Sequence, residues 1–402
     1  MAERSHAVIS GGGVGGLTAA LALARAGLRV TVFERAEDFG DVGAGLQLAP
    51  NATRRLRALG LLERVERHGL AVDQARLRRA RDGADLARAP LGAIAELRWG
   101  APYLVIHRAD LLGVLVAACE AEPAIELRRG VAVGGFAVAS GGVEVATRRG
   151  DELGRVNADV LIAADGLRSA QRERFGFGLG DAPVWSGRVA WRALAPSGAV
   201  PEFARKYETG LWLGPRAHLV HYPLRNGELI NIVAITEDGW RGADASDLWD
   251  AAGDKDVIAR GFERWHPDAR ALIAAAPEWR RWPVFDRAPT RRWTAPQGAA
   301  RVALLGDAAH PMTPFLAQGA AQAIEDASAL GDAFARLGGD IGATLAAYEN
   351  ARAARAAKVV LASRRQGGIY HMGFPLAVAR DLTLARLSPE AMLSRLDWLY
   401  SV

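Results

Sequence analysis

A glycine-rich turn followed by an acidic residue is the feature of this sequence that most directly specifies chemistry. Gly11, Gly13 and Gly16 lie between a short apolar strand and an apolar helix, and Glu34 ends the next strand, 21 residues after Gly13. Gly11 permits a tight turn, Gly13 lets the backbone approach a pyrophosphate, and Gly16 lets the helix pack closely on the strand. The helix N-terminus supplies free N–H groups for phosphates, and Glu34 can accept hydrogen bonds from ribose hydroxyls. The pattern predicts an adenine dinucleotide site rather than a merely structural turn.

Two further acidic residues stand directly after buried strands later in the chain. Asp165-Gly166 follows a strand predicted at 156–164, and Asp307 follows a strand predicted at 301–306. For Asp165, a carboxylate that bonds amides of its own turn is the structural alternative. If these motifs serve one ligand, stretches that are far apart in the sequence must converge in the fold.

The periodicity of the chain predicts the elements that position these residues. Residues 5–35 form a strand, a helix and a strand, residues 72–100 contain a hairpin, and residues 108–122 are helical. Between 183 and 236 apolar and polar residues alternate, which predicts an antiparallel sheet distinct from the nucleotide-binding part. Residues 317–366 are mostly helical.

The composition is typical of a globular protein with a large core. The 402 residues carry a net charge of +5, but only three are lysines and the arginines are spread throughout, so a nucleic-acid-binding stripe is not indicated. Cys119 is the single cysteine, which excludes a disulfide framework, and we predict no metal site. The chain enters its first strand at once, and no apolar run reaches a membrane span of about 18 residues. We therefore expect a cytoplasmic protein that binds neither nucleic acid nor membrane.

Three separated motifs together give the chain a family resemblance. With the strings at 11–16, 159–169 and 303–311, it resembles the single-component FAD-dependent aromatic hydroxylases, the p-hydroxybenzoate hydroxylase-like flavoproteins, to about residue 365. Strings at 43–51 and 317–327 are similar to the salicylate hydroxylase, 3-hydroxybenzoate 6-hydroxylase and 6-hydroxynicotinate 3-monooxygenase branches.

The resemblance implies an α/β fold with two parts. A Rossmann-like FAD-binding domain of the glutathione-reductase type would carry an inserted antiparallel-sheet substrate domain and C-terminal helices. We expect 1–70, 101–175 and 287–365 in the FAD-binding domain, 71–100 and 176–286 in the substrate domain, and 366–402 as a helical tail.

The resemblance also implies a reaction and its cofactor. FAD, reduced by transiently bound NAD(P)H, would react with O2 and hydroxylate a small aromatic, salicylate- or hydroxybenzoate-like ring through a flavin C4a-hydroperoxide, in a monomer or homodimer. By position, Glu34 would bind the adenosine ribose beside Arg35, Arg108 the phosphate–ribityl region, and Asp307 a ribityl hydroxyl. Asp165 would serve FAD and the nicotinamide. The cofactor-binding residues expected on this basis are Gly11, Gly13, Val14, Gly15, Gly16, Glu34, Arg35, Gly45, Arg108, Asp165, Asp307, Gly319 and Ala320.

His221 is the candidate for the group that binds or deprotonates the substrate hydroxyl. It lies on an alternating strand, and an imidazole can accept a phenolic proton near neutral pH. His218, three residues earlier, must lie on the opposite face of a regular strand, so only one of the two can face the pocket. A satisfied histidine on a solvent-facing side is the structural alternative.

Further residues are expected in the substrate pocket, each with a structural alternative. Gln47 either lies by the flavin or substrate or bonds its own loop, and Arg192 pairs with a substrate carboxylate or, as we favour, forms a structural salt bridge. We expect His310 to be structural. The loop Met312–Phe315 departs from the 3-hydroxybenzoate and 6-hydroxynicotinate patterns and is closer to the salicylate hydroxylase pattern. The expected substrate-binding residues are Gln47, Arg192, Tyr222, Met312, Pro314 and Phe315.

Three other functions remain open at this point. The same chemistry on a hydroxynicotinate or a larger natural-product ring is one. A FAD dehydrogenase or oxidase without oxygen insertion is another, and a flavin-binding scaffold is the third, although Asp165, Asp307 and His221 argue against a scaffold.

Overall fold

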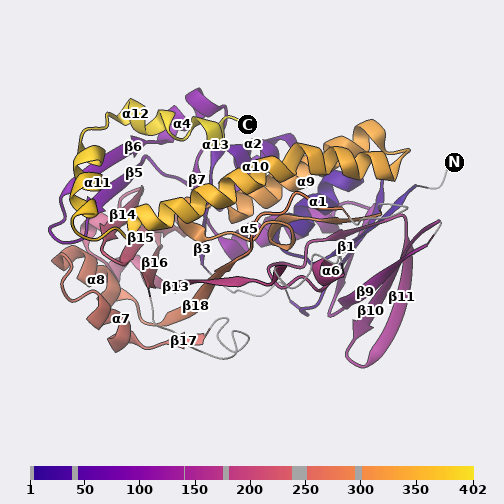
Figure 1. Ribbon diagram of the computed structural model, residues 1–402, viewed down its shortest axis with the longest axis horizontal. Helices are drawn as coiled ribbons and strands as arrows, with labels where there is room; N and C mark the ends of the chain where they lie inside the picture. The colour runs from indigo at the N-terminus through magenta and orange to yellow at the C-terminus, as the bar shows by residue number, and fades with distance from the viewer. Residues whose placement is uncertain (1–3, 39–43, 140, 175–180, 238–250, 295–300) are drawn as a thin grey trace.

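The computed structural model describes residues 4–38, 44–139, 141–174, 181–237, 251–294 and 301–402. Figure 1 shows an elongated molecule in which a parallel sheet lies toward one end and a large antiparallel sheet toward the other. The long helix α10 (Ile341–Tyr370) runs between the two ends. The predicted fold class, α/β with a Rossmann-like parallel sheet and a separate antiparallel sheet, is confirmed.

The parallel sheet has β1 at its centre. Among the described residues its strand order is β19-β12-β1-β2-β8, and every neighbouring pair is parallel. All residues of β1 are buried, as expected for a strand covered on both faces. The helices α1 and α5 pack on this sheet, and a smaller antiparallel sheet, β9-β10-β11, contacts its strands as well. The bounds are β1 His6–Ser10, β2 Arg29–Glu34, β8 Ile125–Arg129, β12 Val160–Ala163, β19 Val302–Leu304, β9 Ala132–Ala139, β10 Gly142–Arg149 and β11 Glu152–Ala158.

The antiparallel sheet contains the region where apolar and polar residues alternate. Its order is β17-β18-β13-β16-β15-β14-β5-β6, and the expected hairpin of residues 72–100 joins it because β5 pairs in parallel with β14. A third small sheet, β3-β7-β4, lies against it. The bounds are β5 Gln74–Arg79, β6 Asp85–Pro90, β13 Val184–Pro196, β14 Glu208–Gly214, β15 Ala217–Leu224, β16 Leu229–Glu237, β17 Ala251–Gly253, β18 Trp279–Asp286, β3 Gly45–Leu48, β4 Leu70–Ala71 and β7 Leu104–His107.

The two faces of this antiparallel sheet have different partners. Along β15, Ala217 and Leu219 point into a core with Ile258 and Leu272, which belong to the helices α7 and α8. Alternate residues such as Val220 point to the other face, which the C-terminal helices α11, α12 and α13 cover (Figure 1). Successive side chains of a strand point to opposite faces, so each position of β15 belongs to one layer only.

The helices begin and end close to the predicted segments. The tail predicted from residue 366 starts inside α10, which continues to Tyr370. Cys119 is buried in α5, where burial raises the pKa of its thiol to about 12. The bounds are α1 Val14–Arg25, α2 Pro50–Ala58, α3 Leu62–Glu66, α4 Gly92–Trp99, α5 Arg108–Glu120, α6 Ala170–Glu173, α7 Lys255–Gly261, α8 Pro267–Ala275, α9 Gly319–Leu337, α11 Leu376–Ala385, α12 Pro389–Ser394 and α13 Asp397–Tyr400.

The close packing of α9 on α1 gives a test of the fold. A Cβ placed on Gly331 of α9 would lie 2.8 Å from the Cβ of Ala22 and 3.1 Å from its carbonyl oxygen, so Gly331→Ala must push two helices apart. We expect it to lower the free energy of unfolding by about 1–3 kcal/mol. Gly113→Ala in α5 is the control, since its Cβ would meet nothing within 4 Å, and it should leave stability unchanged or raise it by about 1 kcal/mol. Urea unfolding measures the free energy of unfolding of both variants. Equal values for the two would refute the close packing of α9 on α1 at Gly331.

Candidate functional site

The carboxyl ends of the parallel strands bring the three sequence motifs together. In the sheet, Ser10 pairs with Ala163, and Ala163 pairs with Leu304. The glycine turn, Asp165 and Asp307 follow these three positions, so they emerge at one edge of the sheet. Ligands of open parallel sheets bind at such an edge.

The glycine turn at this edge has the shape of a phosphate cradle. Gly11 has φ +106°, and a Cβ there would overlap the carbonyl of Ala164, while a Cβ on Gly16 would overlap the carbonyl of Gly11. Gly13 differs, because its Cβ would meet nothing within 4 Å. No side chain caps the start of α1, so its first N–H groups remain available to a ligand. The turn needs glycine twice for packing and leaves room at Gly13 for a ligand.

Charged side chains line both sides of the space beside this turn. Glu34 accepts hydrogen bonds from the backbone N–H groups of Gly12 (2.7 Å) and Ala36 (2.9 Å). Arg108 lies within reach of both Asp307 and Glu34, whose charges partly offset the desolvation that lowers its pKa. Desolvation raises the pKa of Asp307, against the influence of His310 and Arg108. Arg108 thus stands between the acidic residues of two motifs.

Asp165 is held by its own turn. Its carboxylate accepts a hydrogen bond from the Ser169 hydroxyl (2.5 Å) and a longer one from the N–H of Gln171 (3.4 Å). Desolvation raises its pKa, and these bonds oppose the shift. The structural role expected for this carboxylate is present, and its Cα lies beside Gly11.

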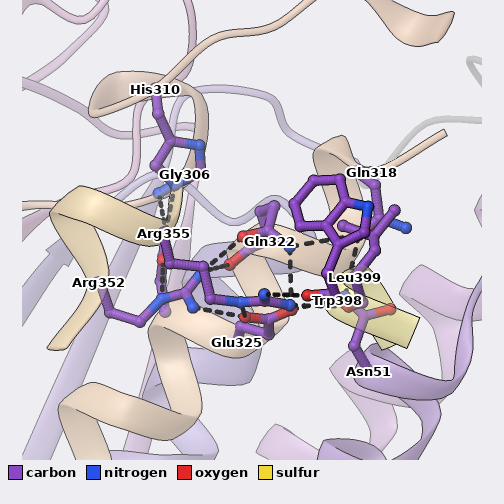
Figure 2. Close-up of polar contacts among 11 residues, drawn as sticks. Asn51, Gly306, His310, Gln318, Gln322, Glu325, Arg352, Arg355, Trp398 and Leu399 are labelled. Atoms are coloured by element: carbon purple, nitrogen blue, oxygen red, sulfur yellow. Dashed lines mark hydrogen bonds and ion pairs between the residues drawn. The ribbon is translucent and has the colours of Figure 1, made fainter. Parts of the chain in front are cut away.

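Asp326, a buried carboxylate that the sequence did not single out, holds the Asp307 turn. It lies on α9 and accepts hydrogen bonds from the N–H of Gly306 (3.0 Å) and from Nε2 of His310 (2.6 Å), and its other oxygen accepts one from Nε of Arg352 (2.7 Å). Figure 2 labels these three partners. His310 is therefore structural, as expected. Burial alone would raise the pKa of Asp326, but His310 and Arg352 hold it below its usual value.

The neighbouring carboxylate, Glu325, ties three further segments to α9 (Figure 2). It accepts hydrogen bonds from Arg352, from Asn51 at the start of α2 (2.6 Å) and from Nε of Arg355 (2.6 Å). Arg355 also donates to the backbone carbonyls of Trp398 (3.2 Å) and Leu399 (2.8 Å) in the C-terminal helices. The string at 317–327 carried this signal in the sequence, although its carboxylates were given no role there.

The N-terminus of α9 is left free by this network. α9 begins at Gly319 with no side-chain cap and no acidic residue in its first turn, and Ala317 before it has φ +52°. The amide of Gln318 is turned aside, since its oxygen accepts a hydrogen bond from Asn51 (2.9 Å). The N–H groups of Gly319 and Ala320 can therefore face an anion, which a helix N-terminus stabilises.

A cavity of about 890 Å³ lies between the antiparallel sheet and the C-terminal helices. Its walls are mostly apolar and include Leu211 and Val220 of the sheet, Pro314 and Phe315 before α9, and Ile369 and Leu399. His218, Gln47 and Tyr103 add polar groups. The volume and the few polar groups are typical of a small-molecule site.

The polar groups of the cavity are linked to one another. The Tyr103 hydroxyl donates a hydrogen bond to Oε1 of Gln47 (2.5 Å), and Gln47 also bonds Tyr222. Burial raises the pKa of Tyr222 and of Tyr103. The Tyr222 ring packs so closely on Gly45 that a Cβ there would lie 2.5 Å from its Cε2. Both phenols stay protonated at neutral pH, and the phenol of Tyr103 donates its hydrogen bond to Gln47.

The comparisons with known proteins agree with one another. The FAD binding domain family matches residues 4–363. The chain is 35% identical to the 3-hydroxybenzoate 6-hydroxylase of Klebsiella oxytoca, over 100% of this chain and 97% of the relative. It is 38% identical to the 3-amino-4-hydroxybenzoate 2-monooxygenase of Streptomyces platensis, over 99% of this chain and 96% of the relative.

Solved structures show the same likeness. Klebsiella pneumoniae HpxO complexed with FAD and uric acid has a TM-score of 0.83 at 27% identity, and the alignment covers 97% of this chain and 95% of that one. A salicylate hydroxylase substrate complex has a TM-score of 0.82 at 26% identity, and the alignment covers 99% of this chain and 96% of that one. This chain belongs to the FAD-dependent aromatic hydroxylases. The predicted family, the FAD cofactor and the monooxygenase class are thereby confirmed, with reduced nicotinamide as co-substrate.

The site of this hydroxylase fits FAD on its own geometry. The open space at Gly13 and the uncapped start of α1 suit the pyrophosphate, and Glu34 lies beside them. The surface of Asp307 is accessible to solvent, yet the protein around it is dense enough that desolvation raises the pKa of its carboxyl group. This combination is expected for a carboxylate that faces an internal space for a ligand. FAD bound there would supply the redox chemistry with reduced nicotinamide and O2.

The structure corrects the choice of His221. The side chain of His221 is fully buried on the α7–α8 side of β15, with its ring 5.7 Å from that of Phe203. Neither ring nitrogen has a hydrogen-bond partner, and desolvation together with the charge of Arg78 lowers its pKa to about 3. His218 lines the cavity instead. The sequence showed that only one of the two could do so, but the alternation does not say which face is the pocket.

The other expected pocket residues divide between lining and support. Pro314, Phe315 and Gln47 line the cavity, whereas Met312 packs in the core beside it. Arg192 does not form the structural salt bridge that we favoured: among the described residues it pairs with no carboxylate and stacks on Trp282 at 4.9 Å. Desolvation lowers its pKa, and the nearby Tyr222 opposes this. Arg35 is exposed, and Val14 is buried at the start of α1.

The described residues contain neither a membrane-spanning helix nor a metal-binding cluster. No helix among the described residues is long and apolar enough to span a membrane. Within the same residues no cluster of three or more metal-ligating side chains occurs.

The role of Gly13 can be tested apart from folding. Because the Cβ of Gly13→Val would enter open space, we expect the apoprotein to keep its circular dichroism spectrum and its thermal midpoint. The added side chain would occupy the room left for the pyrophosphate, and FAD affinity should fall by about tenfold or more. Titration of apoprotein with FAD, followed by flavin fluorescence, measures this. Undiminished affinity would place the dinucleotide elsewhere.

The position of His221 predicts how stability responds to acid. Its pKa is near 6.5 when unfolded and about 3 when folded, so the unfolded state gains a proton first and stability is lost as pH falls from 6.5 toward 3. The variant His221→Leu lacks this loss. Between pH 7 and pH 5 the wild type should lose about 2 kcal/mol more than the variant in free energy of unfolding. Urea unfolding at both pH values checks this, and parallel curves would mean that His221 is accessible to protons.

Proposed function

We propose that this enzyme hydroxylates a small hydroxylated aromatic acid of the hydroxybenzoate type, with NAD(P)H and O2. The observation that carries the proposal is the placement of His218, Gln47 and Tyr103 in a mostly apolar cavity, whose lining also includes Lys358, Arg365 and Arg395. A flat ring fits such walls, and its hydroxyl and carboxylate need the few polar groups. The names of two full-length relatives, a 3-hydroxybenzoate 6-hydroxylase and a 3-amino-4-hydroxybenzoate 2-monooxygenase, support the substrate class.

In this proposal the residues of the cavity prepare the ring for oxygen transfer. His218 accepts the phenolic proton, which makes the ring electron-rich and therefore a better nucleophile. Pro314 and Phe315 hold the ring near the start of α9, and the C-terminal helices exclude water from it. Arg192, on the same sheet face and without a carboxylate partner among the described residues, is one cation that can pair with a substrate carboxylate, and the lining residues Lys358, Arg365 and Arg395 are others. FAD supplies the oxygen-activating chemistry when it is bound.

A larger ring is the second candidate, and the size of the cavity favours it. About 890 Å³ is the volume of sites that take drug-sized ligands, which is more than a single benzoate fills. A bicyclic or substituted aromatic acid would use the same polar groups and more of the apolar wall.

We further propose that the enzyme acts in the cytoplasm, as a monomer or homodimer.

A panel of rings tests the proposal. The purified holoenzyme is assayed for NADH and NADPH oxidation with salicylate, 3-hydroxybenzoate, 3-amino-4-hydroxybenzoate, 6-hydroxynicotinate and a hydroxynaphthoate. A true substrate accelerates oxidation and gives a product heavier by one oxygen atom. If every ring that accelerates oxidation yields only hydrogen peroxide, the protein is an oxidase and the proposal fails.

The role of His218 predicts a contrast between two histidines on one strand. His218→Gln should lower the rate of hydroxylation by about 10²–10⁴-fold, which is the usual contribution of a general base, and leave FAD affinity unchanged. His221→Leu, on the other face, should keep near-wild-type turnover. Product formation and FAD titration of both variants decide. The reverse pattern would restore His221 as the base.

A further inference from the structure

His218 is the first of three titratable side chains that lead out of the cavity. Its Nδ1 lies 2.8 Å from Nε2 of His371, which caps the end of α10, and Nδ1 of His371 lies 3.1 Å from Oε1 of Glu237 at the end of β16. Both imidazoles are about 2% exposed, whereas the side chain of Glu237 is 31% exposed. The chain of contacts therefore begins in the cavity and ends at solvent.

Glu237 and Arg188 compete for Nδ1 of His371, and the shorter contact favours one pair of tautomers. The Glu237 carboxylate, at 3.1 Å, accepts the Nδ1–H, whereas Nε of Arg188, at 3.4 Å, donates only to an unprotonated Nδ1. With Nδ1–H bonded to Glu237, Nε2 of His371 is the acceptor. His218 must then donate its Nδ1–H to His371, which leaves a lone pair on Nε2 of His218. Among the described residues nothing bonds that nitrogen. It is free to accept a proton from a substrate in the cavity.

Burial, with smaller contributions from nearby charges, favours the neutral form of both imidazoles. Desolvation lowers the pKa of His218 well below its usual value, with smaller contributions from His371 and Arg188. Desolvation and Arg188 lower the pKa of His371 to about 4, although Glu237 opposes this. When His371 instead carries its proton on Nε2, Nε of Arg188 donates a hydrogen bond to its Nδ1 (3.4 Å), which is longer than the contact with Glu237.

Further charged and titratable groups face the pair from the neighbouring elements. Arg380 of α11 lowers the pKa of His371, Tyr370 of α10 packs against His218 with ring centroids 5.2 Å apart, and Arg216 lies 3.6 Å from Glu237. Burial raises the pKa of Tyr370 to about 12, so it stays protonated. Neither imidazole can hold a proton as a standing charge, which means that a proton received from the cavity must be passed on.

We propose that His218, His371 and Glu237 form a proton relay that carries the substrate's phenolic proton to solvent. The phenolic O–H bond breaks as Nε2 of His218 takes the proton, Nδ1 of His218 gives its proton to Nε2 of His371, and Nδ1 of His371 gives its proton to the carboxylate of Glu237. Glu237 releases that proton to water, a phenolate is left in the cavity, and both rings end neutral with their N–H on Nε2. The reverse transfer restores the starting tautomers when the oxygen of the hydroxylated product takes up a proton. His371 and Glu237 are positioning residues that act through His218. The inference rests on the proposed function, because it needs a phenolic substrate.

Two variants separate proton transfer from structural support. His371→Gln keeps an acceptor toward His218 and a donor toward Glu237 but cannot pass a proton as an imidazole does, and Glu237→Gln removes the final acceptor. Exposed His68→Gln and Glu228→Gln are the matched controls. Each holoenzyme is assayed with the ring that the wild type hydroxylates, or with 3-hydroxybenzoate if several are, for product formation across pH and in deuterium oxide.

The relay predicts a specific pattern. Both relay variants should bind FAD normally but form product about tenfold more slowly or worse at neutral pH, with a larger solvent deuterium isotope effect than the wild type. Raising the pH should restore part of their rate, because hydroxide then removes the proton. The wild-type rate should fall only as pH approaches about 4, where His371 gains a proton and loses its acceptor nitrogen.

Two sets of results would refute the relay, and a third would refute the proposed function. If both variants match the wild type in rate, pH profile and isotope effect, or if His371→Gln loses only FAD or folding while Glu237→Gln is normal in all three, the relay is refuted. A wild type that forms no hydroxylated product with any ring refutes the proposed function itself, and that outcome is seen without any variant.

Discussion

Two adjacent buried carboxylates on α9 form the interaction on which the rest of the site depends. Glu325 and Asp326 are neutralised mainly by Arg352 and Arg355 of α10, and a buried charge without such partners costs several kcal/mol. Asp326 holds the backbone of Gly306, which precedes the flavin-side Asp307. Glu325 holds the segments at Asn51 and at Trp398–Leu399 through its partners. The turn at Gly306, the start of α2 at Asn51 and the cavity wall at Trp398–Leu399 are therefore all held by this one group of buried ion pairs.

The parallel sheet explains why motifs so far apart in the sequence lie together at one edge. Gly11, Asp165 and Asp307 stand after strands that pair in register, so their distances in space are set by strand spacing rather than by chain length. The antiparallel sheet solves a different problem, because it must present one face to the substrate and the other to α7 and α8. The division of β15 between His218 and His221 follows from that requirement.

The sequence predicted those parts of the fold and site that depend on local patterns. The glycine turn, the strand-end acids, the alternating sheet and the family were all readable, because each is encoded within a few residues. The face of β15 was not, since the same alternation fits either orientation and a one-residue shift reverses every side chain. The partner of His218 lies 153 residues away, and Tyr103 and Arg352 are likewise joined to the site only by tertiary contacts. No local pattern marks such residues.

The C-terminal helices are a functional part of the enzyme rather than an appendage of it. They close the cavity with Leu399 and Tyr400, and the segment that leads into them carries His371, the ring that partners His218. Arg355 bonds their backbone and Glu325 at the same time, so the wall cannot move away from the cavity without breaking these bonds or drawing on the buried ion pairs of α9. Arg355 therefore joins the wall of the cavity to α9, the same helix whose Asp326 holds the backbone of Gly306 before Asp307.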